Sequence, residues 1–235
     1  MPNVSVRGVN TCMFSAPHNN DFMAFKADNA EFSAAFDAAM SVRKFTAGET
    51  MIWQSEDGNH TFCLTKGEAK VVRHSIGGHE IYLAELPSGE LFGELAPLIG
   101  ERRTSNVVAV SDCETQDISA KYLFELMETY PKFAIFMTRM LAARIEKTSR
   151  QIFERLSLPA TRRIYNDLVR RGVQDAGNSE RYTISPPETI TELSARWNLS
   201  RESASRSISE LVRQGLIIKT DAAWHIIQPD FDYAE

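Results

Sequence analysis

The sequence has few cysteines, and they lie far apart along the chain. Cys12, Cys63 and Cys113 are odd in number and widely spaced, and no C-x-x-C occurs. This spacing argues against a disulfide framework, a zinc ribbon and the clustered cysteines of an iron–sulfur sensor. We therefore expect three free thiols and no resident metal.

Long apolar runs are also absent. No window approaches the length that a membrane-spanning helix needs, and the N-terminus lacks a basic segment followed by an apolar one. The hydrophobic and charged fractions, 43% and 24%, are those of an ordinary globular protein. We expect a cytoplasmic protein with no membrane partner.

Catalytic motifs are missing as well. There is no Ser-His-Asp order, nucleophile elbow or P-loop lysine, and paired carboxylates fall in predicted turns. His74 and His79 flank a predicted hairpin, so a haem sensor is conceivable, but neither His60 nor His225 completes a second ligand set. The sequence predicts a protein that is not an enzyme and carries no cofactor.

An overall excess of positive charge is lacking too, since the net charge is −5. Residues 1–156 hold 16 Lys and Arg against 20 Asp and Glu, whereas residues 157–228 hold 10 against 8, a net of +2. Binding to DNA depends on where the positive charge lies, so an acidic first part does not exclude it.

The first part of the chain changes from helical to strand-like periodicity. Residues 1–20 have no periodicity and are predicted to be a mobile arm, and Phe32, Phe36 and Met40 then share one helical face. From about residue 44 to 119, short strand-like runs alternate with turn signals, a pattern typical of an antiparallel roll or barrel. Gly77-Gly78 predicts a two-residue hairpin. The predicted strands include Thr61–Leu64, Ala69–Arg73 and Glu80–Leu86.

One stretch, residues 91–107, combines groups that suit a nucleotide. A tight turn at Gly93 followed by a short helix would point free N–H groups at an anion. Arg103, nine residues after Glu94, could reach the same anion with its planar fork, and Thr104 could add a hydroxyl. Glu94 is an acceptor that a phosphate would repel, so it suits a ribose hydroxyl. Pro97 removes one N–H from this short helix.

Beyond Pro131 the periodicity is helical for more than twenty residues. The predicted helix has an apolar stripe that no neighbouring helix in this segment covers, which favours pairing with a second copy in a parallel dimer. Arg144, Thr148 and Ser149 interrupt the stripe, and a ligand beside it would supply the partners that these polar groups need. The stripe consists of Phe133, Phe136, Met137, Met140, Leu141, Ile145, Ile152 and Phe153.

After Leu158-Pro159 the sequence predicts a winged helix-turn-helix. Thr189 and Glu192 form a capping box, Asn198 suits a left-handed turn, and Ser200 is a good N-cap for a second helix. Two helices across so short a turn form the DNA-binding motif whose second helix enters the major groove. The predicted elements are the helix Ala160–Arg171 capped by Gly172, the strand Arg181–Ile184, the helices Thr189–Trp197 and Arg201–Gln214, and a hairpin of Ile217, Ile218 and Trp224–Ile227.

The second helix of this motif has one apolar and one polar side. Arginines on the polar side could clamp guanine O6 and N7, and a glutamate could accept from cytosine N4. The alternative is a solvated face on which Glu202 and Arg206 form an i,i+4 pair. Thr189 and Thr191 are candidates for phosphate contacts that set position without reading sequence. Ala204, Ile208 and Leu211 form the apolar side, and Arg201, Glu202, Ser205 and Arg206 form the polar side.

From about residue 32 to 227 the chain resembles the cyclic-AMP receptor protein family of bacterial transcription regulators. By this resemblance Arg103 and Thr104 hold the cyclic phosphate, while Glu94 and the Gly93 amide hold the ribose 2′-hydroxyl. The matching motifs are Gly93-Glu94-Leu95-Ala96 with Arg103-Thr104-Ser105, Arg144 with Thr148-Ser149, and Ser200-Arg201-Glu202 with Arg206.

The resemblance also assigns roles to the long helix. It implies that Thr148 meets the adenine of the ligand in its own subunit, that Ser149 meets the adenine in the partner subunit, and that Arg144 pairs with Glu94.

The implied fold is α+β, with a cyclic-nucleotide-binding β-roll over residues 21–131, a dimerisation helix over 132–156 and a winged helix-turn-helix over 157–235. The implied function is that of a homodimeric regulator controlled by cyclic AMP, or by cyclic GMP, that binds palindromic double-stranded DNA with TGTGA-like half-sites and works with RNA polymerase. One alternative keeps the DNA-binding half but responds to haem, to another small molecule or to no effector. A second is a ligand-binding module whose helix-turn-helix mediates only protein contacts.

Overall fold

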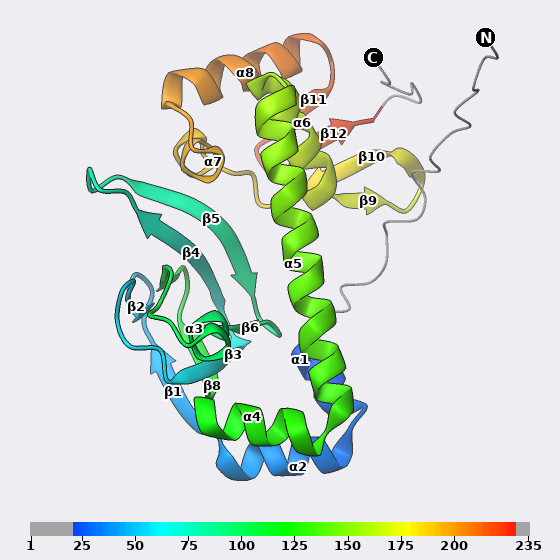
Figure 1. Cartoon of the computed structure of the whole chain (residues 1–235). Helices are drawn as coiled ribbons and strands as arrows, with labels where there is room; N and C mark the ends of the chain where they lie inside the picture. Colours follow the sequence, from blue (N-terminus) through cyan, green and yellow to red (C-terminus); the bar gives the residue numbers. More distant parts are fainter. Residues whose placement is uncertain (1–20, 229–235) are drawn as a thin grey trace, which may run out of the picture.

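The computed structural model describes residues 21–228 (Figure 1). The predicted arm at residues 1–20 lies outside the described residues, as do residues 229–235. A roll of two sheets is flanked by short helices, and one long helix joins it to a smaller unit of helices and strands (Figure 1). The helices are α1 (Phe22–Ala27), α2 (Ala30–Ala39), α3 (Leu95–Ile99), α4 (Ala120–Thr129), α5 (Pro131–Ser157), α6 (Ala160–Arg171), α7 (Ile190–Trp197) and α8 (Arg201–Arg213).

The roll consists of two antiparallel sheets, ordered β1-β8-β3-β6 and β2-β7-β4-β5. Their inner faces enclose a core that includes Phe62, Leu64 and Phe92. The predicted mixed α+β fold is confirmed. The strands are β1 (Ser41–Phe45), β2 (Thr50–Ile52), β3 (His60–Lys66), β4 (Glu68–His74), β5 (Glu80–Pro87), β6 (Leu91–Phe92), β7 (Asn106–Ala109), β8 (Cys113–Ser119), β9 (Val173–Asp175), β10 (Asn178–Ile184), β11 (Ile217–Lys219) and β12 (Trp224–Ile227).

The connection between β4 and β5 differs from the prediction. Instead of a two-residue turn at Gly77-Gly78, the five residues 75–79 join the two strands. The Ser75 N–H donates to the His79 carbonyl at 3.0 Å, and the Gly78 N–H donates to the Ser75 carbonyl at 2.9 Å. These two hydrogen bonds close a longer loop, in which Gly78 has a φ of +77°.

An aromatic cluster attaches the start of the long helix to the first two helices. The ring centroids of Phe22 and Phe36 lie 5.0 Å apart, and those of Phe32 and Phe133 lie 4.7 Å apart. The buried Lys26 ammonium lies 4.7 Å from the Phe36 ring centroid, and it forms an ion pair with a nearby aspartate. Neither α1 nor α4 has a counterpart among the predictions. Six residues, the length of α1, are too few to show a helical period.

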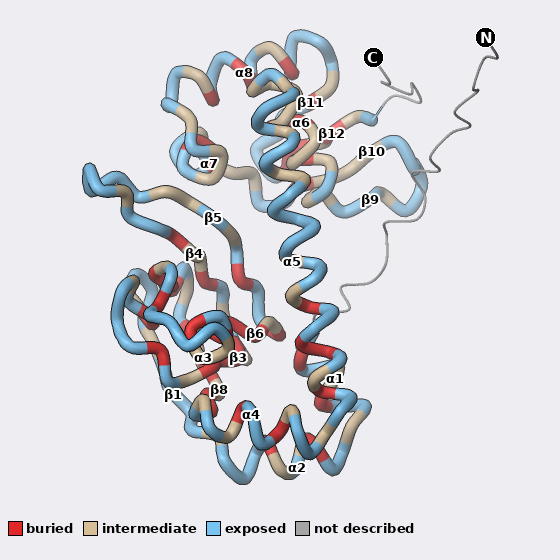
Figure 2. Tube along the Cα trace, viewed as in Figure 1, coloured by how far each residue is buried: buried red, intermediate tan, exposed pale blue. Residues whose placement is uncertain are grey.

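The apolar stripe of α5 is divided between two environments (Figure 2). Its first half, Phe133 to Met140, is buried against α1, α2 and α4, which precede Pro131, so this half of the stripe is not free to pair with a second copy. In the second half Ile152 is 53% exposed and Phe153 is 69% exposed. The helix runs from Pro131 to Ser157, one residue longer at each end than the predicted 132–156.

The smaller unit follows Pro159 and has its own core. Ile164, Leu168 and Leu193 are fully buried there, and the sheet β11-β12-β10-β9 closes the unit. Gly172 follows α6 but is not a left-handed cap, because its φ is −67°. A Cβ at Gly172 would lie 2.7 Å from the Tyr182 Cβ, so close packing of the backbone explains the glycine.

Candidate effector and DNA-binding sites

Gly93 turns the chain between β6 and α3. Its φ is +72°, and an added Cβ would lie 2.9 Å from the Ile52 Cδ1 and 3.0 Å from the Arg103 Nη1. Both the left-handed backbone and the close approach of the arginine therefore require glycine. The turn brings the backbone of the predicted phosphate-binding stretch against its predicted cation.

Arg103 is buried, with 8% of its surface exposed. Its Nη1 donates to the Gly93 carbonyl at 2.6 Å and its Nη2 donates to the His60 carbonyl at 2.8 Å. The guanidinium also lies 5.7 Å from the Phe62 ring centroid. Burial lowers the pKa of Arg103, and the charges of Glu94 and Glu56 oppose that shift. A desolvated guanidinium keeps its charge and is a strong attractor for a small anion.

A cavity of about 280 Å³ lies beside Arg103. Arg43 and Arg103 contribute positive charge to its lining, while Glu56 and Asp57 contribute negative charge. Its volume is close to the lower limit for small-molecule sites, about 300 Å³. Two other cassette residues are exposed, unlike Arg103: Thr104, and Leu95 at 43% exposure.

Glu94 and Arg144 join this cassette to the long helix. Glu94 is 2% exposed, and the Arg144 Nη1 donates to its Oε1 at 2.6 Å. The Arg144 Nη2 donates to the Leu91 carbonyl and lies 3.5 Å from the Glu90 carboxylate. The predicted ribose acceptor is thus in direct contact with α5.

Thr148 and Ser149 lie further along α5, and both are exposed. The Thr148 hydroxyl donates to the Arg144 carbonyl, one turn earlier in the helix, at 2.8 Å. The expected pairing of Arg144 with Glu94 is present, and Thr148 finds its partner within the helix, so these two polar groups do not need a ligand to supply their partners. Among the described residues, neither Thr148 nor Ser149 forms a hydrogen bond with the cassette.

The helix-turn-helix has the local structure that its capping residues predict. The Thr189 hydroxyl accepts from the Glu192 N–H at 3.2 Å, and the Glu192 carboxylate accepts from the Thr189 N–H at 2.8 Å, which confirms the capping box. Asn198 is left-handed, with φ 51° and ψ 49°. The Ser200 hydroxyl accepts from the Ser203 N–H at 3.1 Å and caps α8.

Helix α8 presents its polar side to solvent. Ala204, Ile208 and Leu211 are buried as predicted. In the described part of the chain no salt bridge joins Glu202 to Arg206; the Arg206 Nη2 lies 3.4 Å from the Ser203 hydroxyl instead. Hydrogen bonds from its own backbone N–H and from the Ser200 hydroxyl lower the pKa of Glu202, so it remains a charged acceptor. The exposed residues of this face are Arg201, Glu202, Ser205 and Arg206, and Thr191 on α7 is exposed as well.

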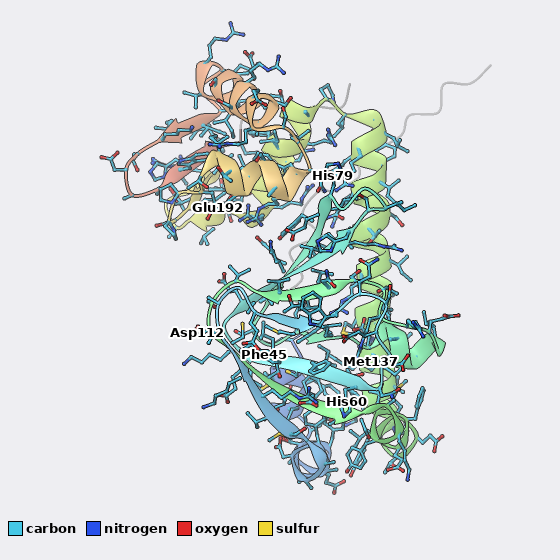
Figure 3. All side chains as sticks on the ribbon, turned by 90° about the vertical axis from the view of Figure 1, so that its left-hand side faces the viewer. Phe45, His60, His79, Asp112, Met137 and Glu192 are labelled. Carbon is cyan, nitrogen blue, oxygen red and sulfur yellow. The ribbon has the colours of Figure 1, made fainter. Side chains whose placement is uncertain are left out.

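The four histidines in the described part of the chain do not gather at one site. His60 and His79 lie at opposite ends of the roll (Figure 3). The His74 Nδ1 is hydrogen-bonded to the Asn106 amide at 2.9 Å, and the His225 Nδ1 to the Thr183 hydroxyl at 3.0 Å. Within residues 21–228 no three or more His, Cys, Asp or Glu side chains gather in a geometry that could hold a metal ion.

No helix among residues 21–228 is both long enough and apolar enough to cross a membrane. The two described cysteines, Cys63 and Cys113, are buried free thiols.

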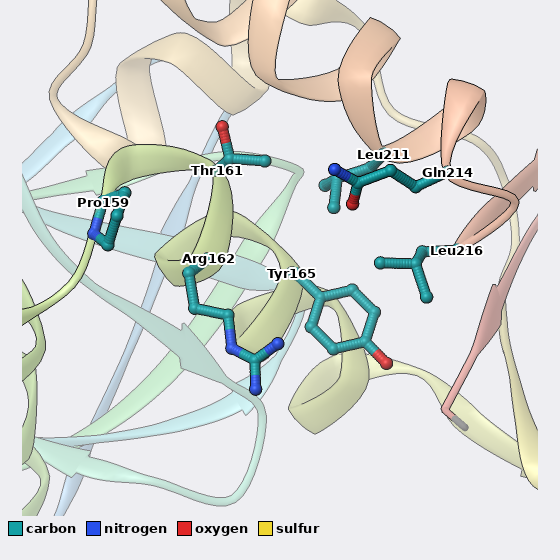
Figure 4. A pocket seen from close by; sticks show the side chains of 7 residues that line it. All are labelled: Pro159, Thr161, Arg162, Tyr165, Leu211, Gln214 and Leu216. Carbon is teal, nitrogen blue, oxygen red and sulfur yellow. The ribbon is translucent and has the colours of Figure 1, made fainter. Parts of the chain in front are cut away.

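Two features near these sites have no counterpart in the predictions. Gly58 brings the β2–β3 loop against the cassette, since a Cβ there would lie 2.2 Å from the Ala96 Cβ. The sequence marks this glycine only as part of a turn. An apolar cavity of about 210 Å³ also lies between α6 and α8, where Tyr165, Leu211 and Leu216 contribute to its lining (Figure 4). The Tyr165 hydroxyl donates to the Ile227 carbonyl at 2.8 Å.

Comparison with known proteins first identifies the kind of domain that the roll forms. Residues 42–130 match the cyclic nucleotide-binding domain family. The chain is 29% identical over 177 residues to the cAMP-activated global transcriptional regulator CRP of Haemophilus influenzae, a match that covers 75% of this chain and 79% of that protein. These matches support a regulator of the CRP/FNR family, and the matching curated relatives are transcription regulators.

Solved structures share the fold. The c-di-GMP responsive global regulator CLP of Xanthomonas campestris has a TM-score of 0.69 at 19% identity, covering 85% of this chain and 99% of that chain. A CooA variant from Carboxydothermus hydrogenoformans has a TM-score of 0.74 at 13% identity, covering 88% of this chain and 91% of that chain. At these identities the likeness concerns the fold alone.

Proposed function

We propose that this chain is a homodimeric transcription regulator controlled by cyclic AMP. In this proposal the ligand phosphate binds Arg103 and Thr104, its ribose binds Glu94 and the Gly93 amide beside Leu95, and its adenine binds Thr148 and Ser149. The dimer binds a palindromic operator with TGTGA-like half-sites, and RNA polymerase is the partner at the promoter. Such a regulator acts in the cytoplasm, where the DNA is.

The contact between Glu94 and Arg144 carries the proposal. A buried carboxylate that is the expected ribose acceptor is already bonded to the long helix at 2.6 Å. A ligand that binds Glu94 must share or replace the hydrogen bond from Arg144. Ligand binding therefore weakens or removes one of the contacts that hold α5 against the cassette. A ligand shifts a conformational equilibrium only when it binds one arrangement more tightly than the other. Cyclic AMP is therefore expected to bind more tightly in the presence of operator DNA.

The exposed half of α5 supports the homodimer. Ile145, Ile152, Phe153 and Leu156 expose large apolar side chains on this part of the helix. A long amphipathic helix with such a surface is commonly covered by a second copy. The cyclic nucleotide-binding match over residues 42–130 and the CRP relatives support the choice of effector.

The DNA-binding assignment follows from the chemistry of α8. Arg201 and Arg206 are suited to guanine and Glu202 to cytosine, while Ser200 and Ser205 lie beside them. Thr189 and Thr191 on the preceding helix are suited to phosphate contacts. Binding of this kind weakens as salt concentration rises, because the protein displaces counterions from DNA.

Calorimetric titration tests the effector. Cyclic AMP and cyclic GMP are titrated against the wild type, Arg103→Ala and the control Arg102→Ala, whose side chain is exposed and lies 3.8 Å from Asp57. Loss of a charge-assisted hydrogen bond should weaken cyclic AMP binding by about tenfold to a hundredfold in Arg103→Ala. Arg102→Ala should bind like the wild type. Equal affinity of all three proteins would contradict the proposed site.

A DNA titration tests the second half of the proposal. The wild type is added to a palindromic TGTGA duplex and to a scrambled duplex at several salt concentrations, with and without saturating cyclic AMP. Specific binding that cyclic AMP strengthens is the expected result. Specific binding that cyclic AMP does not change would favour a regulator with another effector or none, and absence of specific binding would favour a module for protein contacts.

One observation concerns how an anion would reach Arg103. Both terminal nitrogens of Arg103 already donate to main-chain carbonyls, those of Gly93 and His60. An anion must use the remaining N–H groups or displace one of these bonds. The c-di-GMP responsive relative in fold makes c-di-GMP the natural third nucleotide in the titration, and preferential binding of it would replace cyclic AMP in the proposal.

A further inference from the structure

Strand β5 is an edge strand of the roll, and its outer edge faces the helix-turn-helix (Figure 1). Its pairing with β4 is irregular, because Val71 pairs with Ala84 and Val72 pairs with Tyr82, which leaves Leu83 as an extra residue. Such a bulge bends the strand and changes the direction of its backbone groups. An edge strand also has one row of N–H and C=O groups that its own sheet does not use.

Asn198, the left-handed residue between α7 and α8, binds this free edge. Its side-chain Oδ1 accepts from the Tyr82 N–H at 3.1 Å, and its Nδ2 donates to the Tyr82 carbonyl at 3.0 Å. One amide side chain thus satisfies both main-chain groups of one strand residue, as a neighbouring strand would. The two residues are 116 positions apart in sequence.

An ion-pair network surrounds this hydrogen-bonded pair. Arg196, near the end of α7, forms an ion pair with Glu85 on β5 and lies 5.7 Å from the Tyr82 ring centroid. The same guanidinium lies 3.1 Å from the Glu188 carboxylate. Arg171 on α6 lies 3.8 Å from Glu85. A single carboxylate of the roll therefore faces arginines from two helices of the smaller unit.

The contact is packed closely at its centre. The Tyr82 hydroxyl is buried and finds no hydrogen-bond partner among the described residues, and the same is true of the Arg196 Nε. Burial raises the pKa of the Tyr82 phenol to about 12. The tyrosine contributes its ring to the contact with Arg196, while its hydroxyl adds no hydrogen bond.

The contact leaves the DNA-reading surface free. Arg201, Glu202 and Arg206 remain exposed while Asn198 is bound. Asn198 precedes the Ser200 N-cap by two residues, so fixing Asn198 fixes the start of α8. The contact therefore orients the recognition helix and does not cover it.

The β5–α7 contact, formed by Tyr82, Glu85, Arg196 and Asn198, is a second link between the roll and the smaller unit, in addition to the covalent one. The covalent link, at Leu158-Pro159 between α5 and α6, alone would allow rotation about the chain. An ion pair between Arg170 and Glu154 at 2.6 Å restrains α6 against the end of α5. The β5–α7 contact adds a second restraint between the roll and the smaller unit.

We propose that Asn198 and Arg196 are positioning residues that hold the recognition helix in register with β5. The β5–α7 contact then transmits changes in the roll to the DNA-binding unit independently of α5. The transmission step rests on the proposed function, whereas the contact itself does not. Coupling between two sites requires an element whose arrangement both sites influence, and β5 belongs to the sensor while its edge holds the reader.

Hydrogen exchange at single amides tests whether the contact forms. Asn198→Gly keeps a residue that tolerates the left-handed backbone but removes the side-chain amide. The Tyr82 amide should exchange at least tenfold faster in Asn198→Gly than in the wild type, while the amides that pair β4 with β7 should not change. Equal exchange at Tyr82 in both proteins would overturn the proposal, whatever the outcome for nucleotide or DNA.

Operator binding tests whether the contact positions the reader. Glu85→Gln removes the charge that faces α7, and the matched control Glu80→Gln removes an equal charge on the same strand, where Glu80 pairs with Lys70 at 2.7 Å inside the hairpin. The increase in operator affinity produced by saturating cyclic AMP should fall at least fivefold in Glu85→Gln and Asn198→Gly, and stay unchanged in Glu80→Gln.

An unchanged cyclic AMP effect in Glu85→Gln and Asn198→Gly, together with faster Tyr82 exchange in Asn198→Gly, would show a contact that positions nothing and would overturn the proposal. Failure of the proposed function has a different signature, because the wild type itself would then show no cyclic AMP effect on operator binding. In that case differential scanning calorimetry tests whether the β5–α7 contact has a positioning role. One shared unfolding transition in the wild type that separates into two in Glu85→Gln supports the positioning role, and identical transitions refute it.

Discussion

The Arg144 guanidinium on α5 donates to the buried Glu94 carboxylate at 2.6 Å and thereby connects the long helix to the first residue before α3. The carboxylate side chain is only 3% exposed, whereas the arginine is 29% exposed. Loss of this contact therefore costs more free energy at the glutamate than at the arginine, because water cannot replace the lost partner of a buried group.

Arg144→Met should destabilise the protein by about 1–3 kcal/mol, the usual cost of leaving a buried polar group unpaired. Urea denaturation followed by circular dichroism measures the change. The control is Arg150→Met on the same helix, where an exposed i,i+4 pair with Glu146 is worth about 0.3–0.5 kcal/mol. Adding Glu94→Gln to Arg144→Met should recover part of the loss, and no recovery would contradict the assigned cause.

Gly58→Ala should disturb the cassette through packing. The new methyl would lie 2.2 Å from the Ala96 Cβ, and the loop that must move also holds the Arg103 backbone through the Glu56 carbonyl at 2.9 Å. Overpacking of this kind costs about 1–3 kcal/mol. We expect lower stability and weaker cyclic nucleotide binding, measured by denaturation and calorimetry. Gly177→Ala, with no atom within 4 Å of its added Cβ, should be neutral.

Arg206→Ala should relax the base preference of the DNA-binding unit. The lost bidentate contact is worth about 1–3 kcal/mol of discrimination against the wrong base. A binding selection from randomised half-sites measures the preference at each position. Arg213→Ala removes an arginine from the same helix that is paired with Glu210 at 2.6 Å, and should leave the preference intact. An unaltered preference in Arg206→Ala would remove this residue from the reading face.

Phe153→Glu should separate the two subunits of the proposed homodimer. A charge on the exposed apolar half of α5 would have to be buried when that half is covered by a second copy. Sedimentation velocity should show dimers for the wild type and monomers for the variant. Val173→Glu introduces the same charge at an apolar residue that is 75% exposed on β9, and should remain dimeric. A dimeric Phe153→Glu protein would place the interface elsewhere.

Stability should decline in alkaline solution because of Cys63. Burial raises the pKa of this thiol from 9.0 to about 12, while the charge of Lys26 opposes the shift and that of Asp21 adds to it. Above about pH 9 the unfolded chain has released a proton that the folded chain keeps, so the free energy of unfolding falls by about 1.4 kcal/mol per pH unit up to the folded pKa. Denaturation curves between pH 8 and pH 11 should show a shallower decline for Cys63→Ala, and an equal slope would contradict the shift.

The parts of this fold that depend on neighbouring residues could be predicted from sequence. The capping box of Thr189 with Glu192, the left-handed Asn198 and the Ser200 cap act within three or four residues, and all three occur as expected. The strands of the roll were recognisable because turn residues separate them. Helix α1 is too short to show a period.

The parts of the site that depend on distant contacts could not be predicted in the same way. Arg103 donates to the His60 carbonyl, and a backbone acceptor carries no sequence signal. The covering of Phe133 by helices from the start of the chain depends on how the chain folds back. The hydrogen bonds between Asn198 and Tyr82 join two units, and no sequence pattern links one unit to the other.

The division of α5 into a fixed half and an exposed half has a mechanical consequence. With its first ten residues fixed in the aromatic cluster, the helix continues for about 25 Å beyond Met140, at about 1.5 Å per residue. A tilt of about 10° at that point would carry the far end sideways by about 4 Å, from the same helix geometry. The long helix can therefore rotate as a rigid rod about the phenylalanine cluster. A small displacement at Glu94 then becomes a larger displacement at the end of the helix where the DNA-binding unit begins.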